Sequence, residues 1–255
     1  MAVPGSPLPP GAPPELAASE LFAVDAYLRE FDSTVLEVDP VQSRVQLRRT
    51  AFYPGGGGQP HDIGTLTWSD GSASVTRVTR DGGRIWHWVD RLPDPGAEVY
   101  GVLDWERRHL TMRTHTALHI LCGVIWADHG VPVTGGNMDP GRGRLDFPLP
   151  SMSVEFGREV EARVNEEIGK AHRILVEFVG RETADEDHAL IRTAANLIPR
   201  EIDPLRVIDI VGLDKQADGG THVLSTAEVG RVAVTGTESK GKGNKRVRLE
   251  VVDAQ

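Results

Sequence analysis

The stretch WERRHLTMRTHTALHILCGVIWAD, residues 105–128, is where the hydrophobic pattern of the chain changes. Its apolar residues recur at roughly helical intervals, namely Leu110, Met112, Ala117, Leu118, Leu121, Val124 and Ile125. This spacing predicts a long helix, which Gly130 and Pro132 would end. On it, His115 and His119 would share one face, a turn apart, where both imidazoles can hold a single metal ion. Taken alone, two partly buried polar side chains explain the pair better.

The sequence before this helix is β-prone. Short runs rich in β-branched and aromatic residues occur at 35–38, 45–47, 75–78, 85–89 and 99–102. Gly and Asp turn residues separate several of them, which is typical of a small antiparallel barrel or sandwich. The segment 1–18 is rich in proline, so we expect a disordered tail without helix or sheet.

The sequence after the helix mixes both periods. It predicts helices at 154–171 and 182–197, and strands at 174–179, 205–211, 229–235 and 247–252. The predicted fold class is therefore α+β. Residues 1–18 form the tail, 19–104 an antiparallel β-barrel domain, and 105–255 a second, α+β domain.

Composition excludes several classes of protein. The 255 residues carry a formal net charge of -9, which argues against a general nucleic-acid coat but leaves room for a local basic patch. The chain has one cysteine, so an internal disulfide framework is excluded. No apolar run is long enough to span a bilayer, and the N-terminus lacks the pattern of a secretory signal. We expect a soluble cytoplasmic protein, and nothing indicates a stable protein partner.

A third histidine strengthens the metal hypothesis. In Asp218-Gly219-Gly220-Thr221-His222, two glycines between an acid and a histidine can form a tight turn that aims both side chains at one point. Three imidazoles with a carboxylate can fill a zinc site, and three with water would leave an open, catalytic position. An ordinary Asp-Gly-Gly turn is the alternative.

The histidine pair followed by 219–222 resembles the editing domain of alanyl-tRNA synthetases and of the AlaX-type alanyl-tRNA editing proteins. The resemblance covers roughly residues 20–253. It includes the glycine-rich FYPGGGGQP at 52–60, DIGTL at 62–66, GRLDF at 143–147, EVG at 228–230 and ESKGKG at 238–243. It implies an editing domain after the β-barrel, in a free-standing protein of medium length without an additional C-terminal domain.

The resemblance implies an aminoacyl-tRNA deacylase. Its substrate would be mischarged tRNA(Ala), above all Ser-tRNA(Ala), with Gly-tRNA(Ala) as a second candidate. The metal would be Zn²⁺, held by His115, His119, Asp218 and His222. Zinc could lower the pKa of bound water, polarise the ester carbonyl, or mainly bind the amino group of the substrate.

One position departs from the family pattern. The family often has cysteine where this chain has Asp218, and a carboxylate is a harder zinc ligand than a thiolate. Asp218 could ligate the metal, orient a water or cap the turn, and we slightly favour a place at or near the metal. Cys122, three residues after His119, is more typical of the core, although it is the only thiolate that the chain offers.

Selectivity and tRNA binding are assigned to loops. Serine differs from alanine by a hydroxyl, so a polar editing pocket can favour it. We expect Thr134 and then Asn137 to contact substrate, together with Gly219, Gly220 and Thr221. For the tRNA we expect contacts from Gly56, Gly57, Gly58, Gln59, Lys240 and Lys242, although a structural turn and a solvated lysine-rich hairpin are equally consistent.

Two other functions stay open at this point. The chain could be a non-catalytic tRNA-binding module that kept the fold, a reading that the aspartate at the metal motif favours. It could also edit another mischarged tRNA, since the editing domain of threonyl-tRNA synthetases shares the histidine pair. The β domain with its glycine-rich signature favours the alanine branch.

Overall fold

The structure is a computed structural model that describes residues 7–253, except 152, 188–189, 191, 193–198, 240 and 242. The chain forms two compact units, Met1–His109 and Leu110–Gln255. The division falls a few residues after the predicted domain boundary, within the same long helix.

Part of the N-terminal tail is helical, which corrects the expectation for residues 1–18. Helix α1 (Pro14–Ser19) begins with a proline at its first position, and α2 (Leu21–Val24) follows. Proline is tolerated in a first turn because its missing N–H would have no helical partner there. Thr50 secures the segment, since its N donates to Ser19 O and its O accepts from Leu21 N, both at 2.9 Å. Residues 1–6 lie outside the described residues.

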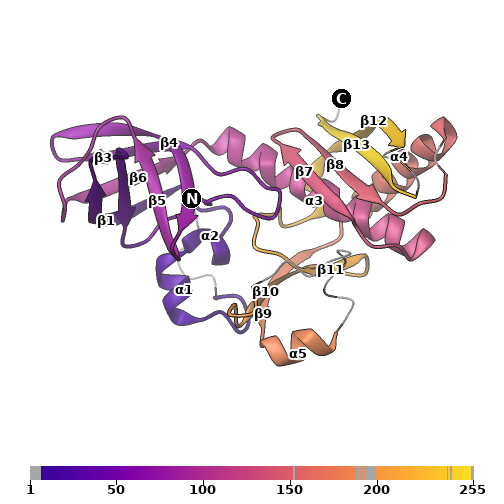
Figure 1. The fold of residues 1–255 in the computed structure, drawn as a ribbon, viewed down its shortest axis with the longest axis horizontal. Helices are drawn as coiled ribbons and strands as arrows, with labels where there is room; N and C mark the ends of the chain where they lie inside the picture. The colour runs from indigo at the N-terminus through magenta and orange to yellow at the C-terminus, as the bar shows by residue number, and fades with distance from the viewer. Residues whose placement is uncertain are drawn as a thin grey trace. The chain divides into compact units, whose positions relative to one another are not determined.

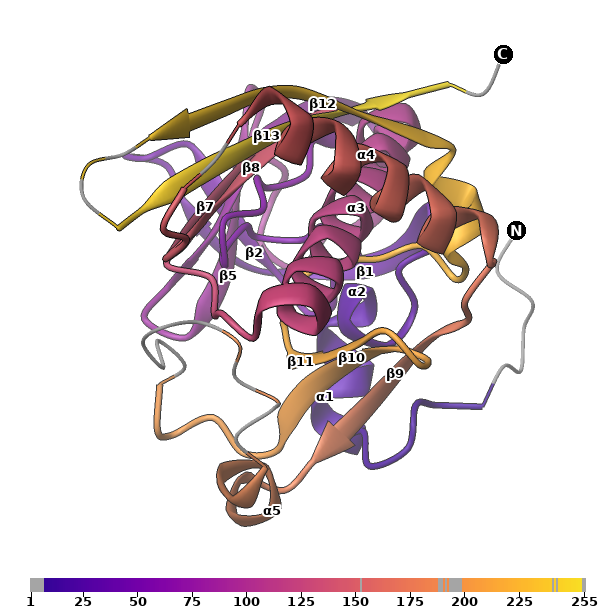
Figure 2. The same cartoon turned by 90° about the vertical axis from the view of Figure 1, so that its right-hand side faces the viewer.

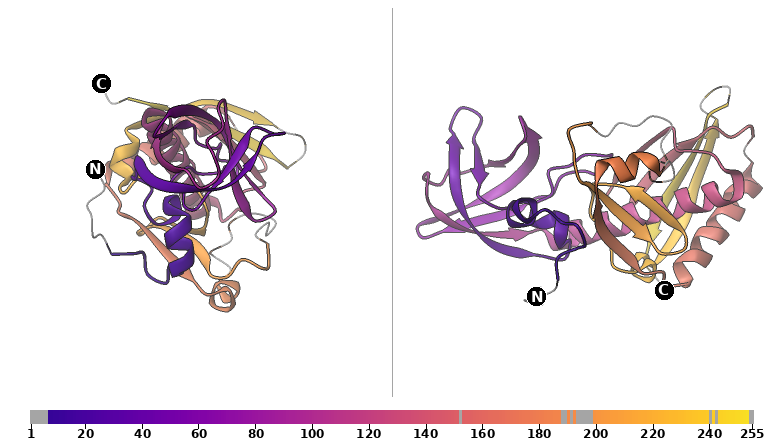
Figure 3. Two further views of the ribbon diagram at one scale, coloured as in Figure 1. Left: turned by 90° about the vertical axis from the view of Figure 1, so that its left-hand side faces the viewer. Right: turned by 90° about the horizontal axis from the view of Figure 1, so that it is seen from below.

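The first unit is built around a closed antiparallel barrel, as the sequence predicted (Figures 1 and 3). Its strands are β1 (Glu30–Asp39), β2 (Arg44–Leu47), β3 (Gly64–Trp68), β4 (Gly71–Asp81), β5 (Arg84–Val89) and β6 (Glu98–Leu103), in the order β1-β2-β5-β4-β3-β6. Alternate residues point inward, and the interior is filled by buried side chains that include Val35, Phe52, Leu66 and Val78. Strand β3 was not among the predicted runs, although Leu66 and Trp68 alternate with two threonines along it.

A buried ion pair connects the start of the long helix to a loop of this unit. Arg108 is fully buried, and its Nε lies 3.0 Å from each carboxylate oxygen of Asp62. The guanidinium also donates to the carbonyls of Ala26 and Ala51, at 2.9 and 2.6 Å. The Asp62 carboxylate accepts from the N–H of Tyr53 at 2.6 Å as well, so it fixes both ends of the glycine-rich segment between them.

The glycine-rich loop itself is a closed turn. Gly56 and Gln59 exchange backbone hydrogen bonds of 3.1 and 2.9 Å. All four glycines of 55–58 have positive φ, between 58° and 136°, a region that other residues rarely adopt. The sequence therefore needs glycine here for conformation, and Gly56, Gly57 and Gly58 stay exposed.

The second unit contains two sheets and the long helix α3 (Trp105–His129), which begins in the first unit (Figure 2). The order of the four-stranded sheet is β12 (Arg231–Ser239), β13 (Lys245–Val252), β8 (Arg142–Phe147) and β7 (Gly135–Asp139). A three-stranded sheet has the order β11 (Asp214–Ala217), β10 (Leu205–Ile210) and β9 (Ile174–Val179). All pairs are antiparallel.

Shorter elements complete this unit. Helix α4 (Val154–Gly169) is capped by Ser153, whose hydroxyl accepts from Phe156 N, and it lies against β12. Helix α5 (Arg181–Glu186) covers only the beginning of the helix predicted at 182–197, much of which lies outside the described residues. The 3₁₀ turn η2 (Thr226–Val229) precedes β12.

The core of the second unit surrounds α3. Met112, Ala117, Ile120, Leu121 and Ile125 are completely buried. Within the described part of the chain, no helix is both long enough and apolar enough to cross a membrane. Because α3 is buried on most sides, its polar residues such as His115 are buried too. These residues face other polar groups in the interior of the second unit.

Candidate metal centre

Four side chains from two distant parts of the chain meet in the second unit. His115 and His119 project from α3, and Asp218 and His222 come from the loop after β11. One ligand atom from each lies within 4.8 Å of those of the other three. We call this set the His₃Asp cluster. Its four residues are those that the sequence motifs indicated as candidate metal ligands.

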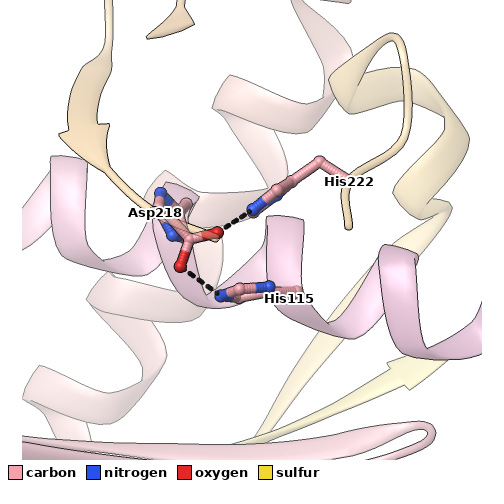
Figure 4. Close-up of side chains that lie close together, drawn as sticks. His115, Asp218 and His222 are labelled. Carbon is pink, nitrogen blue, oxygen red and sulfur yellow. Dashed lines mark hydrogen bonds and ion pairs between the residues drawn. The ribbon is translucent and has the colours of Figure 1, made fainter. Parts of the chain in front are cut away.

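Asp218 lies between two of the histidines (Figure 4). Its Oδ1 lies 3.7 Å from His115 Nε2, and its Oδ2 lies 3.1 Å from His222 Nε2. The rings of His115 and His222 are stacked with centroids 4.2 Å apart, and His119 meets both edge-on at 5.0 and 4.7 Å. The three histidines are buried, with 4–8% of their surface exposed.

The loop that carries Asp218 is tightly held. Gly220 N donates to Asp218 Oδ2 at 2.7 Å, which closes a turn across Gly219. Arg206, on the neighbouring strand β10, donates through Nη1 to the carbonyls of Asp218 and Gly220 at 3.0 and 2.7 Å. In addition, Asp218 N donates to Arg206 O at 3.0 Å. One arginine thus fixes the loop from two sides.

Polar partners also hold two of the imidazoles. Thr116 Oγ1 lies 3.1 Å from His222 Nδ1. His119 Nδ1 lies 3.0 Å from Asp214 Oδ2, and the Asp214 carboxylate is fully buried. Sequence reasoning missed Thr116, although it lies between the two histidines of the helix motif, and it missed Asp214 and Arg206, which no motif contains. Their partners lie about a hundred residues away or on a neighbouring strand.

Burial and the neighbouring side chains together shift the pKa values of the cluster. Burial lowers the pKa of His115 well below its usual value, and it lowers the pKa of His222 to about 4 against the opposing effect of Asp218. Burial would raise the pKa of the Asp218 carboxyl, but the His115 and His222 imidazoles outweigh it and hold that pKa well below its usual range. For His119, burial lowers the pKa, yet Asp214 outweighs it and the net shift is upward. Neutral imidazoles and an ionised carboxylate are the forms that ligate metals.

The donor set fits a divalent transition metal. Ligand atoms at about 2.0–2.2 Å around a tetrahedral zinc ion are about 3.3–3.6 Å apart. The separations of 3.1 and 3.7 Å from Asp218 to its two histidines bracket that range. Buried imidazoles with one carboxylate suit zinc, whereas calcium and magnesium prefer oxygen donors.

Cys122 does not join the cluster. It is buried and its Sγ accepts a hydrogen bond from Gln216 Nε2 at 3.3 Å. Burial raises the pKa of its thiol, so the neutral form is favoured. The prediction of a core role describes this environment well.

The residues predicted to contact substrate are placed as follows. Gly219 is exposed, whereas Gly220 and Thr221 are buried in the loop of the cluster. Thr134 precedes β7, and its hydroxyl donates to Asn244 Oδ1 at 2.9 Å. Asn137 is exposed on β7. No interaction joins Thr134 or Asn137 to the cluster among those recorded for the described residues, and their role stays a prediction.

The basic run near the C-terminus is partly neutralised. Lys240 and Lys242 lie outside the described residues. Arg246 forms a two-bond pair with Asp146, at 2.7 and 2.8 Å, and Arg248 pairs with Glu238 at 2.7 Å. Carboxylates of the protein therefore pair with these two arginines and balance their positive charge.

Comparison with known proteins places the chain among tRNA-related families. The family described as threonyl and alanyl tRNA synthetase second additional domain matches residues 205–248, and the class II (A) tRNA synthetase family matches residues 20–107. The alanine–tRNA ligase of Pyrococcus furiosus is 35% identical over 232 residues, which are 89% of this chain and 25% of the ligase.

Two smaller relatives match over nearly their whole length. The alanyl-tRNA editing protein AlaX-M of Saccharolobus solfataricus is 37% identical over 236 residues, 91% of this chain and 98% of that protein. The AlaX-M protein of Methanosarcina mazei is 34% identical over 242 residues, 91% of this chain and 96% of that protein. With this identity and coverage, and with the motifs in the predicted order, the chain belongs to the alanyl-tRNA editing protein family.

Proposed function

We propose that this chain hydrolyses the ester bond of mischarged Ser-tRNA(Ala) with a zinc ion held by the His₃Asp cluster. The family assignment makes it an enzyme of the aminoacyl-tRNA deacylase type. The observation that carries the proposal is the convergence of three buried imidazoles and one carboxylate within 4.8 Å, in an editing-family chain. We place the reaction in the cytoplasm, where mischarged tRNA arises.

The cluster residues have distinct tasks in this proposal. His115, His119 and His222 provide nitrogen ligands, and Asp218 provides an oxygen ligand at the position where the family often has cysteine. Once bound, zinc would supply Lewis-acid activation of the ester carbonyl or of water. Arg206 keeps the Asp218 loop in place, because its guanidinium occupies the carbonyls of Asp218 and Gly220.

Selectivity for serine over alanine needs a protein group that forms a hydrogen bond with the seryl hydroxyl. A synthetic pocket built for alanine cannot strongly reject a residue that adds one small group, so a second site must sort the products. We propose Thr134 for this contact, with Asn137, Gly219, Gly220 and Thr221 lining the substrate. The Thr134 hydroxyl, which contacts Asn244 in the structure, keeps lone-pair capacity for a second hydrogen bond.

The tRNA contacts are proposed from the exposed glycines and the hairpin lysines. Gly56, Gly57 and Gly58 expose backbone without side chains, which allows a close approach of the tRNA acceptor end, and Gln59 lies buried beneath them. Lys240 and Lys242 would meet phosphates. The paired Arg246 and Arg248 leave this task to the lysines.

The test combines metal analysis with deacylation of Ser-, Gly- and Ala-tRNA(Ala). The proposal expects about one zinc per chain, hydrolysis of Ser-tRNA(Ala) well above Ala-tRNA(Ala), loss of activity with a chelator and recovery with zinc. If the protein binds the tRNA but neither binds zinc nor hydrolyses the ester, it is a non-catalytic module. Hydrolysis of mischarged tRNA(Thr) alone would assign the other editing specificity.

A further inference from the structure

A buried carboxylate outside the His₃Asp cluster contacts one of its histidines. Asp214 begins β11, and its side chain is fully buried. Its Oδ2 lies 3.0 Å from His119 Nδ1 and accepts from Gln216 Nε2 at 2.7 Å. Its Oδ1 accepts from Arg192 Nη1 at 2.7 Å. Three donors therefore converge on one carboxylate.

This arrangement determines which nitrogen of His119 carries hydrogen. An ionised carboxylate can only accept hydrogen bonds, so His119 Nδ1 must donate to Asp214. In a neutral imidazole the other nitrogen then has the free lone pair, and only that nitrogen can ligate a metal. For His119 this is Nε2. The neutral ring would otherwise distribute its proton between both nitrogens.

We propose that Asp214 is a positioning residue of the metal centre, holding His119 in the tautomer and orientation that present Nε2 to the cluster. The inference rests on the proposed function, since it assigns a role toward the metal that the cluster would hold. Carboxylate partners of metal-ligating histidines act in this way in many metalloproteins. Arg192 and Gln216 direct the carboxylate, because they occupy both of its oxygens.

The local packing explains how Asp214 reaches α3. Gly123 lies one helical turn after His119, and a side chain there would be 3.0 Å from Leu213 O and 3.2 Å from Asp214 Cβ. Such contacts are too tight for most side chains, so glycine permits the β10–β11 turn to approach the helix. A Cβ atom at position 123 would require Leu213 or Asp214 to shift by a few tenths of an ångström.

Arg192 also connects this network to the segment proposed to select the substrate. Its guanidinium lies over the ring of Trp126 on α3, 5.1 Å from the ring centroid. Its carbonyl accepts from Val133 N at 2.8 Å, next to Thr134. The residue that holds Asp214 therefore also fixes the start of the β7 segment.

The variant Asp214→Asn tests the proposal. An amide offers one acceptor oxygen to three donors, so at least one of these hydrogen bonds is lost while the shape is retained. Gln216→Met is a milder second variant that removes one donor to Asp214 and leaves the carboxylate, in case Asp214→Asn fails to fold. Asp209→Asn is the matched control, because Asp209 is a partly buried aspartate on β10 whose backbone pairs with Lys215.

Two measurements are made on each protein. Long-range ¹H–¹⁵N spectra of the metal-free protein report the tautomer of His119, and competition with a fluorescent chelator reports the zinc dissociation constant. At a pH well above the raised pKa of His119, where the ring is neutral, we expect a pure Nδ1–H tautomer in the wild type and in Asp209→Asn, and a mixture in Asp214→Asn. The zinc dissociation constant should rise roughly 10–100-fold in Asp214→Asn, with a smaller change in the same direction in Gln216→Met.

The outcomes separate the two claims. Folded Asp214→Asn with the wild-type tautomer and wild-type zinc affinity overturns the role of Asp214. If Asp214→Asn does not fold, a wild-type His119 that carries its proton on Nε2 in the metal-free protein overturns it instead. A wild-type protein that binds no zinc defeats the proposed function, while the tautomer in the metal-free protein still decides whether Asp214 positions His119.

Discussion

Replacing Asp62 by asparagine would unpair the most deeply buried arginine of the first unit. The side chains of Arg108 and Asp62 are 0% and 4% exposed, and the carboxylate accepts from the Nε of Arg108 and the N–H of Tyr53. An asparagine keeps the volume but turns one acceptor into a donor that faces these groups. Removing one partner of such a pair typically costs about 3–5 kcal/mol, because a charge remains buried without compensation.

A loss of this size is a large part of the stability of an ordinary domain, which is about 5–15 kcal/mol. Four of the five tryptophans lie in the first unit, so fluorescence in a urea titration follows mainly its unfolding; they are Trp68, Trp86, Trp88 and Trp105. We expect the free energy of unfolding to fall by about 3–5 kcal/mol in Asp62→Asn.

The matched control is Asp81→Asn, on the same barrel. The Asp81 side chain is 63% exposed, and its partner Arg44 keeps a second carboxylate, Asp39, at 3.0 Å. The expected loss there is at most about 1 kcal/mol. If the free energy of unfolding fell by no more than about 1 kcal/mol in Asp62→Asn as well, the reasoning would be refuted. The double variant Asp62→Asn with Arg108→Met should cost less than the sum of its parts.

Three further predictions concern the site, its selectivity and pH. His119→Ala should abolish zinc binding and deacylation while circular dichroism stays unchanged, and His129→Ala, at the end of the same helix, should retain both; wild-type activity in His119→Ala would exclude the metal mechanism. Thr134→Val should lower hydrolysis of Ser-tRNA(Ala) by roughly threefold to tenfold, since one neutral hydrogen bond contributes about 0.5–1.5 kcal/mol, and should affect Gly-tRNA(Ala) less; equal losses on both substrates would show that the hydroxyl only holds the turn with Asn244. Burial lowers the pKa of His87 to about 4, against 6.5 when unfolded, so the folded barrel should lose about 3 kcal/mol as the pH falls from above 6.5 to below 4; His87→Gln should flatten that part of the stability curve, and an unchanged slope would contradict it.

Local patterns in the sequence predicted α3, α4 and five of the six barrel strands, and they placed two residues of the cluster on one helix. Helical spacing puts His115 and His119 on one face, although taken alone it favoured two partly buried polar side chains. Runs of β-branched and aromatic residues between turn residues indicated the barrel strands. The Asp-Gly-Gly-Thr-His turn indicated Asp218 and His222 as further candidate ligands, and the family resemblance then grouped them with this pair, since nothing local shows that residues a hundred positions apart meet. The structure supplies that contact through the packing of the β10–β11 turn on α3.

The remaining features depend on tertiary contacts that leave no periodic trace. In the sequence, Asp214 looks like an ordinary polar residue of a short strand. Arg108 looks like one of several charged residues at the start of a helix. Their roles appear only when the carboxylate at 214 meets His119 and the guanidinium at 108 meets Asp62. In the N-terminal tail the sequence pattern was misleading, because its proline content suggested disorder. Tertiary contacts order part of it, since the backbone of Thr50 forms hydrogen bonds with Ser19 and Leu21.

The absence of sulfur from the His₃Asp cluster has a consequence for oxidative damage. Peroxides attack thiolates, and a metal site built on cysteine can lose its ligand to sulfenic or sulfinic acid. In the proposed metal site the fourth donor would be the Asp218 carboxylate, and the only thiol of the chain is buried with its pKa raised. Peroxide therefore finds no reactive sulfur at this centre, and its ligand set should persist under conditions that would disable a cysteine-containing relative.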